Sequence, residues 1–332
     1  MSTFVNGRTP LVPPDILPVP DLIQRPLWSV MIPTYNCLHY LKHTLESVLA
    51  QGINPEFMQI EVVDDCSSDG DIKALVEQIG EGRIGFFQQS QNQGSLRNFE
   101  TCLQRSVGKW IHILHGDDMV VPGFYKEIEK MFLMFPHAGA AFTDFIYIGP
   151  DGEEQRREDK LLEEPGIPDN WLGLIATRNR IQPPSIVVKR SVYEDLGSFY
   201  GVHYGEDWEM WVRISSRYSI VHSPEYLALY RVHTTNITSD SFLTCQNIKD
   251  VKDVINRIQD YLPLKDRGKL RKRAKVHFSK VFAVCANKVY HDSKNRKAAL
   301  MQVIGALGMS VNRYTMFGFM KILGKILIRY KY

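Results

Sequence analysis

The chain has 332 residues, of which 44% are hydrophobic and 23% are charged, a composition that is ordinary for a globular protein and argues against intrinsic disorder. Its five cysteines are odd in number and form no C-x-x-C pair, which argues against a disulfide framework and a zinc knuckle. No stretch approaches the roughly 18 apolar residues of a membrane span, and the N-terminus lacks the pattern of a signal peptide. We therefore expect a cytoplasmic protein.

The net charge of +3 conceals an unequal distribution along the chain. Residues 241–332 carry 20 Lys and Arg against 5 Asp and Glu, a balance of +15, which leaves a balance of −12 for residues 1–240. A basic segment of this kind suits an anionic surface, either membrane phospholipid or a polyanionic partner. A solvated helical face is the alternative.

The predicted elements begin after a proline-rich arm at residues 1–26. Four short apolar segments of strand type recur, and each is followed by a helical signal. The expected strands cover residues 29–33, 59–63, 84–87 and 110–114, and helical apolar spacing runs over 41–49, 72–79 and 96–107, with Pro122 opening a fourth helix. This alternation predicts an α/β fold with right-handed crossovers and a mainly parallel sheet that is covered on both faces.

The second half of the chain begins with a strand at 140–146 and a turn at 149–152. A charged stretch up to residue 164 is typical of a surface excursion. We then expect a strand at 185–188, a short helix at 191–196 and a longer helix at 206–215. From residue 245 the pattern is helical, so we place a domain boundary near residue 240, between a domain at 27–240 and a helical region at 241–332.

Polar clusters follow three of the predicted strands, at residues 34–36, 64–69 and 115–118. Ligands of parallel sheets bind beyond the carboxyl ends of the strands, where these clusters lie. Adjacent carboxylates such as Asp117 and Asp118 repel each other and are typically neutralised by a cation or a donor. The pair therefore predicts a cation site at this edge.

Residues 80–85 spell G-x-G-x-x-G, a pattern associated with dinucleotide binding. That motif must follow a strand and open a helix, whereas here it follows a helix and leads into a strand. We interpret it as a helix end and a turn, which disfavours ordinary dehydrogenase chemistry.

Several segments, taken in order, resemble the family-2 glycosyltransferases, and the resemblance covers roughly residues 27–240. It implies a GT-A fold, a nucleotide-sugar donor, a divalent metal and inversion at the anomeric carbon. The matching segments are SVMIPTYN (29–36), EVVDDCSSD (61–69), NQGSLRN (92–98), HGDD (115–118), GEDWEMW (205–211) and YRVHTTN (230–236).

The donor site implied by this resemblance begins at the first strand end, with Pro33, Thr34 and Tyr35. The Tyr35 ring would stack on the base, and Asp65, beside Asp64, would accept from the N–H of a uracil ring. The alternative is that Tyr35 packs in the core while the aspartates only cap a helix.

Two further parts of the donor site carry charge. Arg97, at the start of a helix, is placed to meet phosphate or base oxygens, and a surface salt bridge is its alternative. Asp117 is the expected metal ligand, because oxygen ligands suit Mg2+ or Mn2+. The commonest family pattern is D-x-D-D, so His115 replaces one carboxylate, and an imidazole contact would favour Mn2+. His233 would help to close the diphosphate and metal site.

The resemblance makes Asp207 the catalytic base, which takes the proton of the acceptor hydroxyl as that oxygen attacks the anomeric carbon. Glu206 and Trp208 flank this residue, and we assign them to the acceptor side. Acidic residues in a first helical turn also favour the helix dipole, which is compatible with catalysis.

The C-terminus resembles a basic amphipathic helix. Lys321, Lys325 and Arg329 are spaced by four residues, and an apolar surface is supplied by Phe317, Met320, Leu323, Leu327 and Ile328. Such a helix can lie in the interface of an anionic membrane, or it can pack on the catalytic domain.

The resemblance implies an inverting glycosyltransferase. With the basic C-terminus, it predicts a cytoplasmic enzyme, peripheral at the inner face of a membrane, that acts on a glycan or lipid-linked acceptor in cell-surface polysaccharide synthesis. A UDP-hexose is the favoured donor, with dTDP- and GDP-sugars left open, and no nucleic-acid partner is expected. The alternatives are a sugar-nucleotide nucleotidyltransferase, which would need a Gly-rich loop after the first strand, and a noncatalytic binder of nucleotide sugars or glycans.

Overall fold

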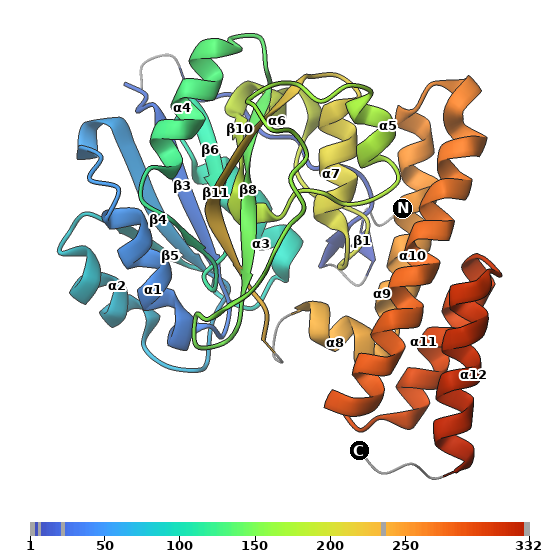
Figure 1. Ribbon diagram of the computed structural model, residues 1–332. Helices are drawn as coiled ribbons and strands as arrows, with labels where there is room; N and C mark the ends of the chain where they lie inside the picture. The colour runs from blue at the N-terminus through green and yellow to red at the C-terminus, as the bar shows by residue number, and fades with distance from the viewer. Residues whose placement is uncertain (1–3, 6–7, 21–23, 234–236, 329–332) are drawn as a thin grey trace. The chain divides into compact units, whose positions relative to one another are not determined.

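A computed structural model describes residues 4–5, 8–20, 24–233 and 237–328 (Figure 1). The chain divides into two compact units, a sheet unit and a helical unit. The sheet unit comprises residues 1–169, 181–201 and 217–232. The helical unit comprises residues 170–180, 202–216 and 233–332.

The sheet unit is built on a nine-stranded sheet with the order β5-β4-β3-β6-β10-β8-β11-β7, and β9 pairs with β8. Strands β5, β4, β3 and β6 are mutually parallel, as the alternation of strands and helices predicts, and β8 and β11 are also parallel. Antiparallel pairs join β10 to β6 and β8, β7 to β11, and β9 to β8. The strands are β3 (Trp28–Thr34), β4 (Met58–Asp64), β5 (Gly85–Gln88), β6 (Trp110–Ile113), β7 (Met119–Val120), β8 (Ala140–Ile148), β9 (Glu154–Arg157), β10 (Ile186–Lys189) and β11 (Ile220–Arg231).

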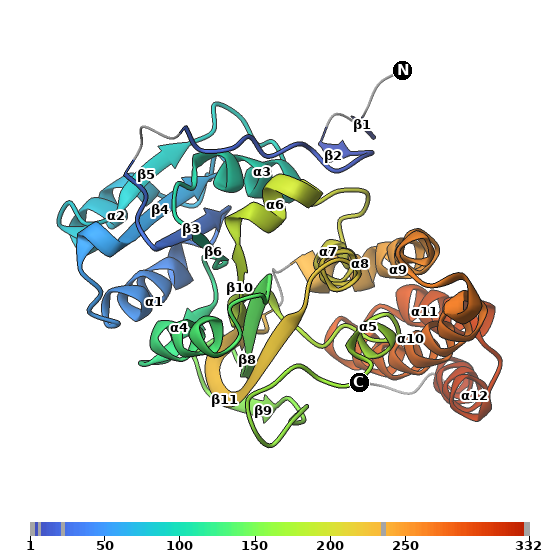
Figure 2. The same ribbon diagram turned by 90° about the horizontal axis from the view of Figure 1, so that it is seen from above.

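Helices cover both faces of this sheet, as Figure 2 shows. Helices α1, α2 and α4 lie on one face, and α3 and α6 lie on the other. Two short 3-10 turns, at Pro55–Phe57 and Pro183–Ser185, and a two-stranded ribbon of β1 (Phe4–Val5) and β2 (Thr9–Pro10) complete the unit. The helices are α1 (Leu38–Leu49), α2 (Ile72–Gly80), α3 (Ser95–Arg105), α4 (Phe124–Met134) and α6 (Arg190–Leu196).

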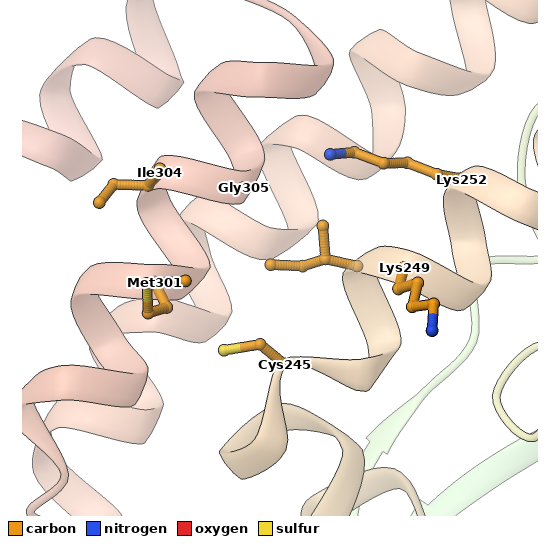
Figure 3. Close-up of a pocket in the computed structure, with 7 residues that line it drawn as sticks. Cys245, Lys249, Lys252, Met301, Ile304 and Gly305 are labelled. Atoms are coloured by element: carbon orange, nitrogen blue, oxygen red, sulfur yellow. The ribbon is translucent and has the colours of Figure 1, made fainter.

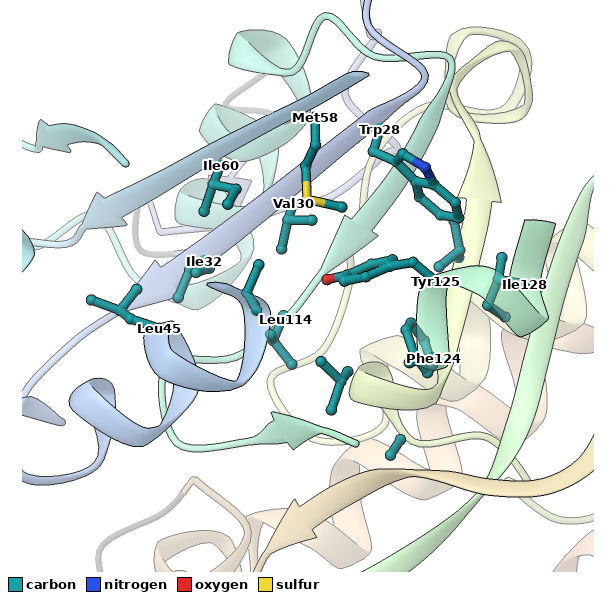
Figure 4. Packing of buried hydrophobic residues seen from close by; sticks show 14 of the residues in the cluster. Trp28, Val30, Ile32, Leu45, Met58, Ile60, Leu114, Phe124, Tyr125 and Ile128 are labelled. Carbon is teal, nitrogen blue, oxygen red and sulfur yellow. The ribbon is translucent and has the colours of Figure 1, made fainter. Parts of the chain in front are cut away.

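The core between the sheet and helices α1, α2 and α4 is formed by every second side chain of the strands, because alternate residues of a strand point to the same face. Trp28, Val30 and Ile32 of β3 all point to this face, where they meet α1 and α4 (Figure 4). Because a slip of one residue would turn these side chains to the opposite face of the sheet, packing against α1 and α4 fixes the register of the parallel strands. That register places Thr34 opposite Asp64, so the polar residues after β3 and β4 begin at the same edge of the sheet.

The helical unit consists of α5 and α7 together with the C-terminal helices. Helix α10 packs against α11 and α12, and the core of these helices includes Ala286, Tyr290, Ala299 and Val303 with Ile322 of α12. The predicted helical C-terminal region is therefore confirmed, and no described helix is both long and apolar enough to span a bilayer. The helices are α5 (Trp171–Ile175), α7 (Glu206–Ser215), α8 (Ile237–Thr244), α9 (Gln246–Arg257), α10 (Leu264–Asp292), α11 (Arg296–Met309) and α12 (Arg313–Leu327), with a 3-10 turn at Ile258–Tyr261.

Candidate active site

The loop that leaves β3 is tied to the loop that leaves β4. The Asn36 N–H donates to the Ser67 hydroxyl at 2.9 Å, and the Asn36 side-chain oxygen accepts from the Ser68 N–H at 2.8 Å. Asn36 has a left-handed backbone with φ 48°, which asparagine tolerates better than most residues. The Tyr35 side chain, next to this tight turn, is 50% exposed, so it does not pack in the core.

Asp64, the last residue of β4, is fully buried and works as a local anchor. One of its oxygens accepts from the Ser67 N–H at 3.1 Å and from the Gln88 side-chain amide at 2.9 Å. The other oxygen accepts from the Ser67 hydroxyl. These bonds hold the strand end rigid, since both oxygens of a buried carboxylate are satisfied within the fold.

Asp65 ties a third loop to the same edge. Its two oxygens accept backbone N–H bonds from Gln93 at 2.7 Å and Gly94 at 2.9 Å, and its own N–H donates to the Thr34 carbonyl at 2.8 Å. Burial raises the pKa of the Asp65 carboxyl, and the two N–H donors oppose that shift. Because a carboxylate has about four lone-pair sites, Asp65 remains able to accept a further hydrogen bond from a ligand.

Arg97 lies in the first turn of α3, which begins at Ser95 after Gly94. Gly94 has φ 90°, a conformation that favours glycine. The Arg97 guanidinium forms an ion pair with Glu100, one turn along the helix. The salt bridge considered from the sequence is therefore present, and a role for Arg97 toward phosphate or base oxygens stays a prediction.

A group of potential metal ligands follows β6. One ligand atom each from His115, Asp117 and Asp118 lie within 4.8 Å of one another. The His115 ring stacks on the Phe99 ring of α3, with 5.3 Å between the ring centroids. Burial lowers the pKa of His115, and the charge of Asp117 opposes this. The imidazole is therefore neutral at physiological pH, which is the form that binds a metal.

Asp118 completes this group from a buried position. One of its oxygens accepts from the Arg231 backbone N–H at 2.8 Å, whereas the other is buried and accepts no hydrogen bond from any described residue. Burial, followed by the nearby charge of Asp117, raises the pKa of Asp118 well above its usual value. An unsatisfied carboxylate oxygen beside a second carboxylate and a neutral imidazole fits a divalent cation such as Mn2+ or Mg2+.

Arg231, at the end of β11, was not among the site residues predicted from the sequence. Its Nε donates to the Asp117 carbonyl at 2.8 Å, and its Nη1 donates to the carbonyls of Gly149 at 3.0 Å and Pro150 at 2.8 Å. A buried arginine thus fixes the loop that carries the two aspartates. The sequence marks Arg231 only by its place in the YRVHTTN segment, the same segment that contains His233.

Asp207 is the second residue of α7 in the helical unit. One oxygen of its carboxylate accepts from the Trp208 N–H at 2.6 Å, and the other accepts from the Asn179 side-chain amide at 2.8 Å. Burial raises the pKa of Asp207 to about 6, while these two donors pull it down. The group is therefore ionised at neutral pH yet more basic than an ordinary aspartate. Sequence patterns gave no signal for Asn179.

The two neighbours of Asp207 differ in environment. Burial, and then the charge of Asp207, raises the pKa of Glu206 well above its usual value. Trp208 is almost completely buried; its indole N–H donates to the Ile175 carbonyl at 2.6 Å, and its ring lies 4.7 Å from that of Phe278. Trp208 thus anchors the first turn of α7 to α5 and α10.

The structure groups the predicted residues by unit. Pro33, Thr34, Tyr35, Asp64, Asp65, Arg97, His115, Asp117 and Asp118 belong to the sheet unit. Glu206, Asp207, Trp208 and His233 belong to the helical unit, where the His233 carbonyl accepts from the Ser239 hydroxyl at 2.8 Å. The rest of the YRVHTTN segment, residues 234–236, lies outside the described residues.

Comparison with known sequences decides the family. Residues 29–197, just over half of the chain, match the profile of Glycosyl transferase family 2. The chain belongs to this family. Curated relatives include an uncharacterized glycosyltransferase of Haemophilus influenzae, 23% identical over 87% of this chain and 88% of its own length. Another is the putative teichuronic acid biosynthesis glycosyltransferase TuaG of Bacillus subtilis, 33% identical over 42% of this chain and 54% of its own length.

Solved structures confirm the GT-A type of fold for this family-2 glycosyltransferase. Staphylococcus aureus TarS 1–349 in complex with UDP-GlcNAc superposes with a TM-score of 0.63, at 16% identity, over 92% of this chain and 93% of its own. The mannosyltransferase PcManGT from Pyrobaculum calidifontis, in complex with GDP-Man and Mn2+, gives a TM-score of 0.56, at 16% identity, over 96% and 84% of the two chains. The predicted fold class and the prediction of a glycosyltransferase are thus confirmed.

Proposed function

We propose that this family-2 glycosyltransferase moves a hexose from a UDP-sugar, with inversion, to a hydroxyl of a glycan or lipid-linked acceptor in cell-surface polysaccharide synthesis. The observation that carries the proposal is the shared edge of β3, β4 and β6 in the sheet unit. There, a buried carboxylate with unused lone pairs and a group of His and Asp ligands follow adjacent parallel strands. TarS with UDP-GlcNAc and the name of TuaG support the donor and the polysaccharide role.

The nucleotide would bind at the ends of β3 and β4. In this proposal the exposed Tyr35 ring stacks on the base, beside Pro33 and Thr34, while Asp65 accepts the ring N–H. Asp64 would hold the end of β4 in place and would not contact the nucleotide itself, because its oxygens accept hydrogen bonds from Ser67 and Gln88. The Arg97 guanidinium would donate hydrogen bonds to the phosphate or base oxygens.

A divalent cation, Mn2+ or Mg2+, would be held by Asp117, Asp118 and His115, and His233 would help to close that site. The ion supplies positive charge that offsets the negative charge of the departing nucleoside diphosphate. The neutral imidazole of His115 favours Mn2+ over Mg2+. Arg231 keeps the two aspartates in place through its hydrogen bonds to Asp118 and to the Asp117 carbonyl.

Asp207 is proposed as the general base of a single displacement. The acceptor oxygen forms a bond to the anomeric carbon, the bond from that carbon to the diphosphate oxygen breaks, and the proton of the acceptor hydroxyl passes to Asp207. Asn179 and the Trp208 N–H orient the carboxylate for this step. Glu206 would face the acceptor, and Trp208 would fix that side through its buried ring.

A panel of nucleotide sugars tests the donor and the reaction together. We expect metal-dependent binding and slow hydrolysis of one UDP-hexose, with Asp207→Asn lowering transfer by about 10²–10⁴-fold while donor affinity changes little. Asp240→Asn, at an acidic position in the first turn of α8, is the matched control and should keep full activity. Failure to respond to any sugar nucleotide would refute the donor, and retained transfer by Asp207→Asn would refute the base.

We also propose that α12 contacts the inner face of an anionic membrane. On the inward side of this helix, Ile322 is buried among α10 and α11. On its outward side, Phe317, Met320 and Leu327 are 69%, 60% and 73% exposed. The helix thus packs on its own unit and still presents an apolar face next to Lys321, which supports an interfacial position. Arg329 of the predicted basic spacing lies outside the described residues.

A further inference from the structure

A groove of about 310 Å³ lies between α9 and α11 of the helical unit, remote in sequence from every proposed catalytic residue. Figure 3 shows Met301 and Ile304 on the α11 side and two lysines on the α9 side. Its lining is more apolar than polar and contains no acidic residue. The lining residues are Cys245, Ile248, Lys249, Lys252, Met301, Ile304 and Gly305.

The α11 wall of the groove is an exposed apolar ridge. Met301 and Ile304 are 47% and 46% exposed, one turn apart on the helix. Behind them, Gly305 lets the two helices approach closely, because a Cβ at this position would lie 2.3 Å from the end of the Ile248 side chain. The floor is therefore hydrocarbon, and the ridge offers the contact that an aliphatic chain would gain by leaving water.

The α9 wall supplies positive charge. Lys249 and Lys252 are one turn apart, and neither forms an ion pair with any described residue. The acidic neighbours on α9 are engaged elsewhere: Asp250 accepts from the backbone N–H of Tyr204 at 3.1 Å, and Asp253 pairs with Arg257 at 3.0 Å. The positive charge at the groove is thus not compensated from its own helix.

The sequence of the neighbouring helices adds to this field. Residues 293–332, which include all of α11 and α12, contain no Asp or Glu. A hydrocarbon floor beside two ammonium groups matches a ligand that is both anionic and aliphatic. A free anion would leave Met301 and Ile304 in water, and a neutral lipid would leave the lysines without a partner.

We propose that this groove binds an anionic phospholipid of the membrane surface, with the phosphate between Lys249 and Lys252 and an acyl chain along Met301 and Ile304. Such a site gives the helical unit a lipid contact of defined chemistry, separate from the outward face of α12. The proposal does not depend on the transferase chemistry, because lipid binding is measured without a donor or an acceptor.

Methyl NMR of the full chain labelled at methionine tests the site, with the Met301 signal assigned through Met301→Leu. Monomeric dihexanoyl phosphatidylglycerol should shift the Met301 signal saturably. Dihexanoyl phosphatidylcholine, with the same chains, and glycerol phosphate, without chains, should each bind at least about tenfold more weakly. Equal binding of glycerol phosphate would show a plain anion site, and equal binding of phosphatidylcholine would show a plain apolar groove; either result overturns the proposal.

Two double variants complete the test. Lys249→Gln with Lys252→Gln should weaken phosphatidylglycerol binding by about tenfold or more, because each lysine near an anionic lipid contributes about 1 kcal/mol. Lys269→Gln with Lys272→Gln removes the same charge at the same spacing from the exposed surface of α10 and should leave affinity unchanged. Unchanged binding in the first variant, or equal loss in both, would contradict a built site.

Discussion

Glu206 and Asp207 are consecutive acidic residues whose pKa values are raised by burial. The Trp208 N–H and the Asn179 side-chain amide each donate to one oxygen of the Asp207 carboxylate, and these bonds favour its charged form. Burial, and then the adjacent charge of Asp207, raise the pKa of Glu206 well above its usual value. As the pH rises, we therefore expect Asp207 to lose its proton first while Glu206 keeps one.

This order predicts the pH dependence of transfer. A general base works only when ionised, so kcat/KM should rise with pH up to a midpoint near 6, the pKa of Asp207, and level off above it. Below the midpoint it should fall about tenfold per pH unit. The measurement is the pH profile of kcat/KM for the donor identified in the panel.

Glu206→Gln is the control for that profile. If Glu206 is protonated while Asp207 titrates, the amide replaces one neutral group with another, and the midpoint stays near 6. A midpoint that moved clearly downward in Glu206→Gln would show that Glu206 carries charge in the working enzyme. A profile flat from pH 5 to 8 would remove Asp207 from the role of base.

Site residues that would contact a ligand themselves could be predicted from the sequence, whereas residues that only position another side chain could not. Asp117 and Asp118 could be predicted as a candidate cation site, because paired carboxylates after a strand are an unusual pattern. Asn179 and Arg231 act on aspartates that are respectively 28 and 113–114 residues away in sequence. Such partnerships are set by tertiary structure: the YRVHTTN segment marks Arg231 but not its contacts with the two aspartates, and no sequence pattern marks Asn179.

At the scale of elements, the loop before β6 depends on one close backbone contact. A Cβ on Gly108 would lie 2.5 Å from both the Ser29 nitrogen and the Trp28 carbonyl carbon of β3. Backbone atoms in a paired strand cannot rotate away as a side chain does. The approach of β6 to β3, which aligns the loop at residues 115–118 with the ends of β3 and β4, thus requires glycine at position 108.

Gly108→Ala should therefore destabilise the sheet unit by about 3 kcal/mol, the upper end of the usual cost of overpacking. Urea unfolding followed by circular dichroism measures the change. Gly85→Ala is the control in the same unit, because its Cβ would meet only atoms at 3.4–3.7 Å and the change should stay within about 0.5 kcal/mol. Equal midpoints for the two variants would contradict the close contact.

Elements differed in how far the sequence could define them. Strands β3, β4 and β5 lie within one or two residues of their predicted ranges, and β3 and β4 are apolar runs that are buried along almost their whole length. Helices α1, α2 and α3 follow their apolar periodicity, because each buries one face. The strand expected at 185–188 is β10, but its antiparallel pairing with β6 and β8 was not predicted, because those partners come from distant parts of the chain. Strand β7 has only two residues, too few to show a pattern. Strand β9 is formed by four exposed polar residues inside the predicted surface excursion, so no apolar pattern marks it.

For the whole molecule, the exposed apolar face of α12 belongs to the part of the chain that carries the excess of positive charge. Residues 241–332 carry a balance of +15, residues 1–240 carry −12, and the apolar face of α12 lies in the basic part. An anionic membrane attracts the first part and repels the second, so the charge distribution would orient the enzyme before any side chain inserts. In this scheme the positive charge attracts the protein to the membrane, and the exposed apolar side chains of α12 then stabilise the bound state by inserting into the interface.

This reasoning predicts how the protein binds vesicles. Flotation with vesicles that contain phosphatidylglycerol should recover the protein at low salt and much less at high salt, because salt screens the attraction. Phe317→Asp with Met320→Asp should reduce binding by about tenfold or more, since each removes an inserted apolar side chain and adds a repelled charge.

The matched control lies on α4 of the acidic part. Leu133 and Met134 are also exposed apolar neighbours, at 72% and 53%, so Leu133→Asp with Met134→Asp adds the same charge and removes similar apolar area. If α12 is the membrane face, this control floats like the original protein. Equal losses in the two variants would mean that overall charge alone governs binding, and an unchanged α12 variant would assign the membrane contact to another surface.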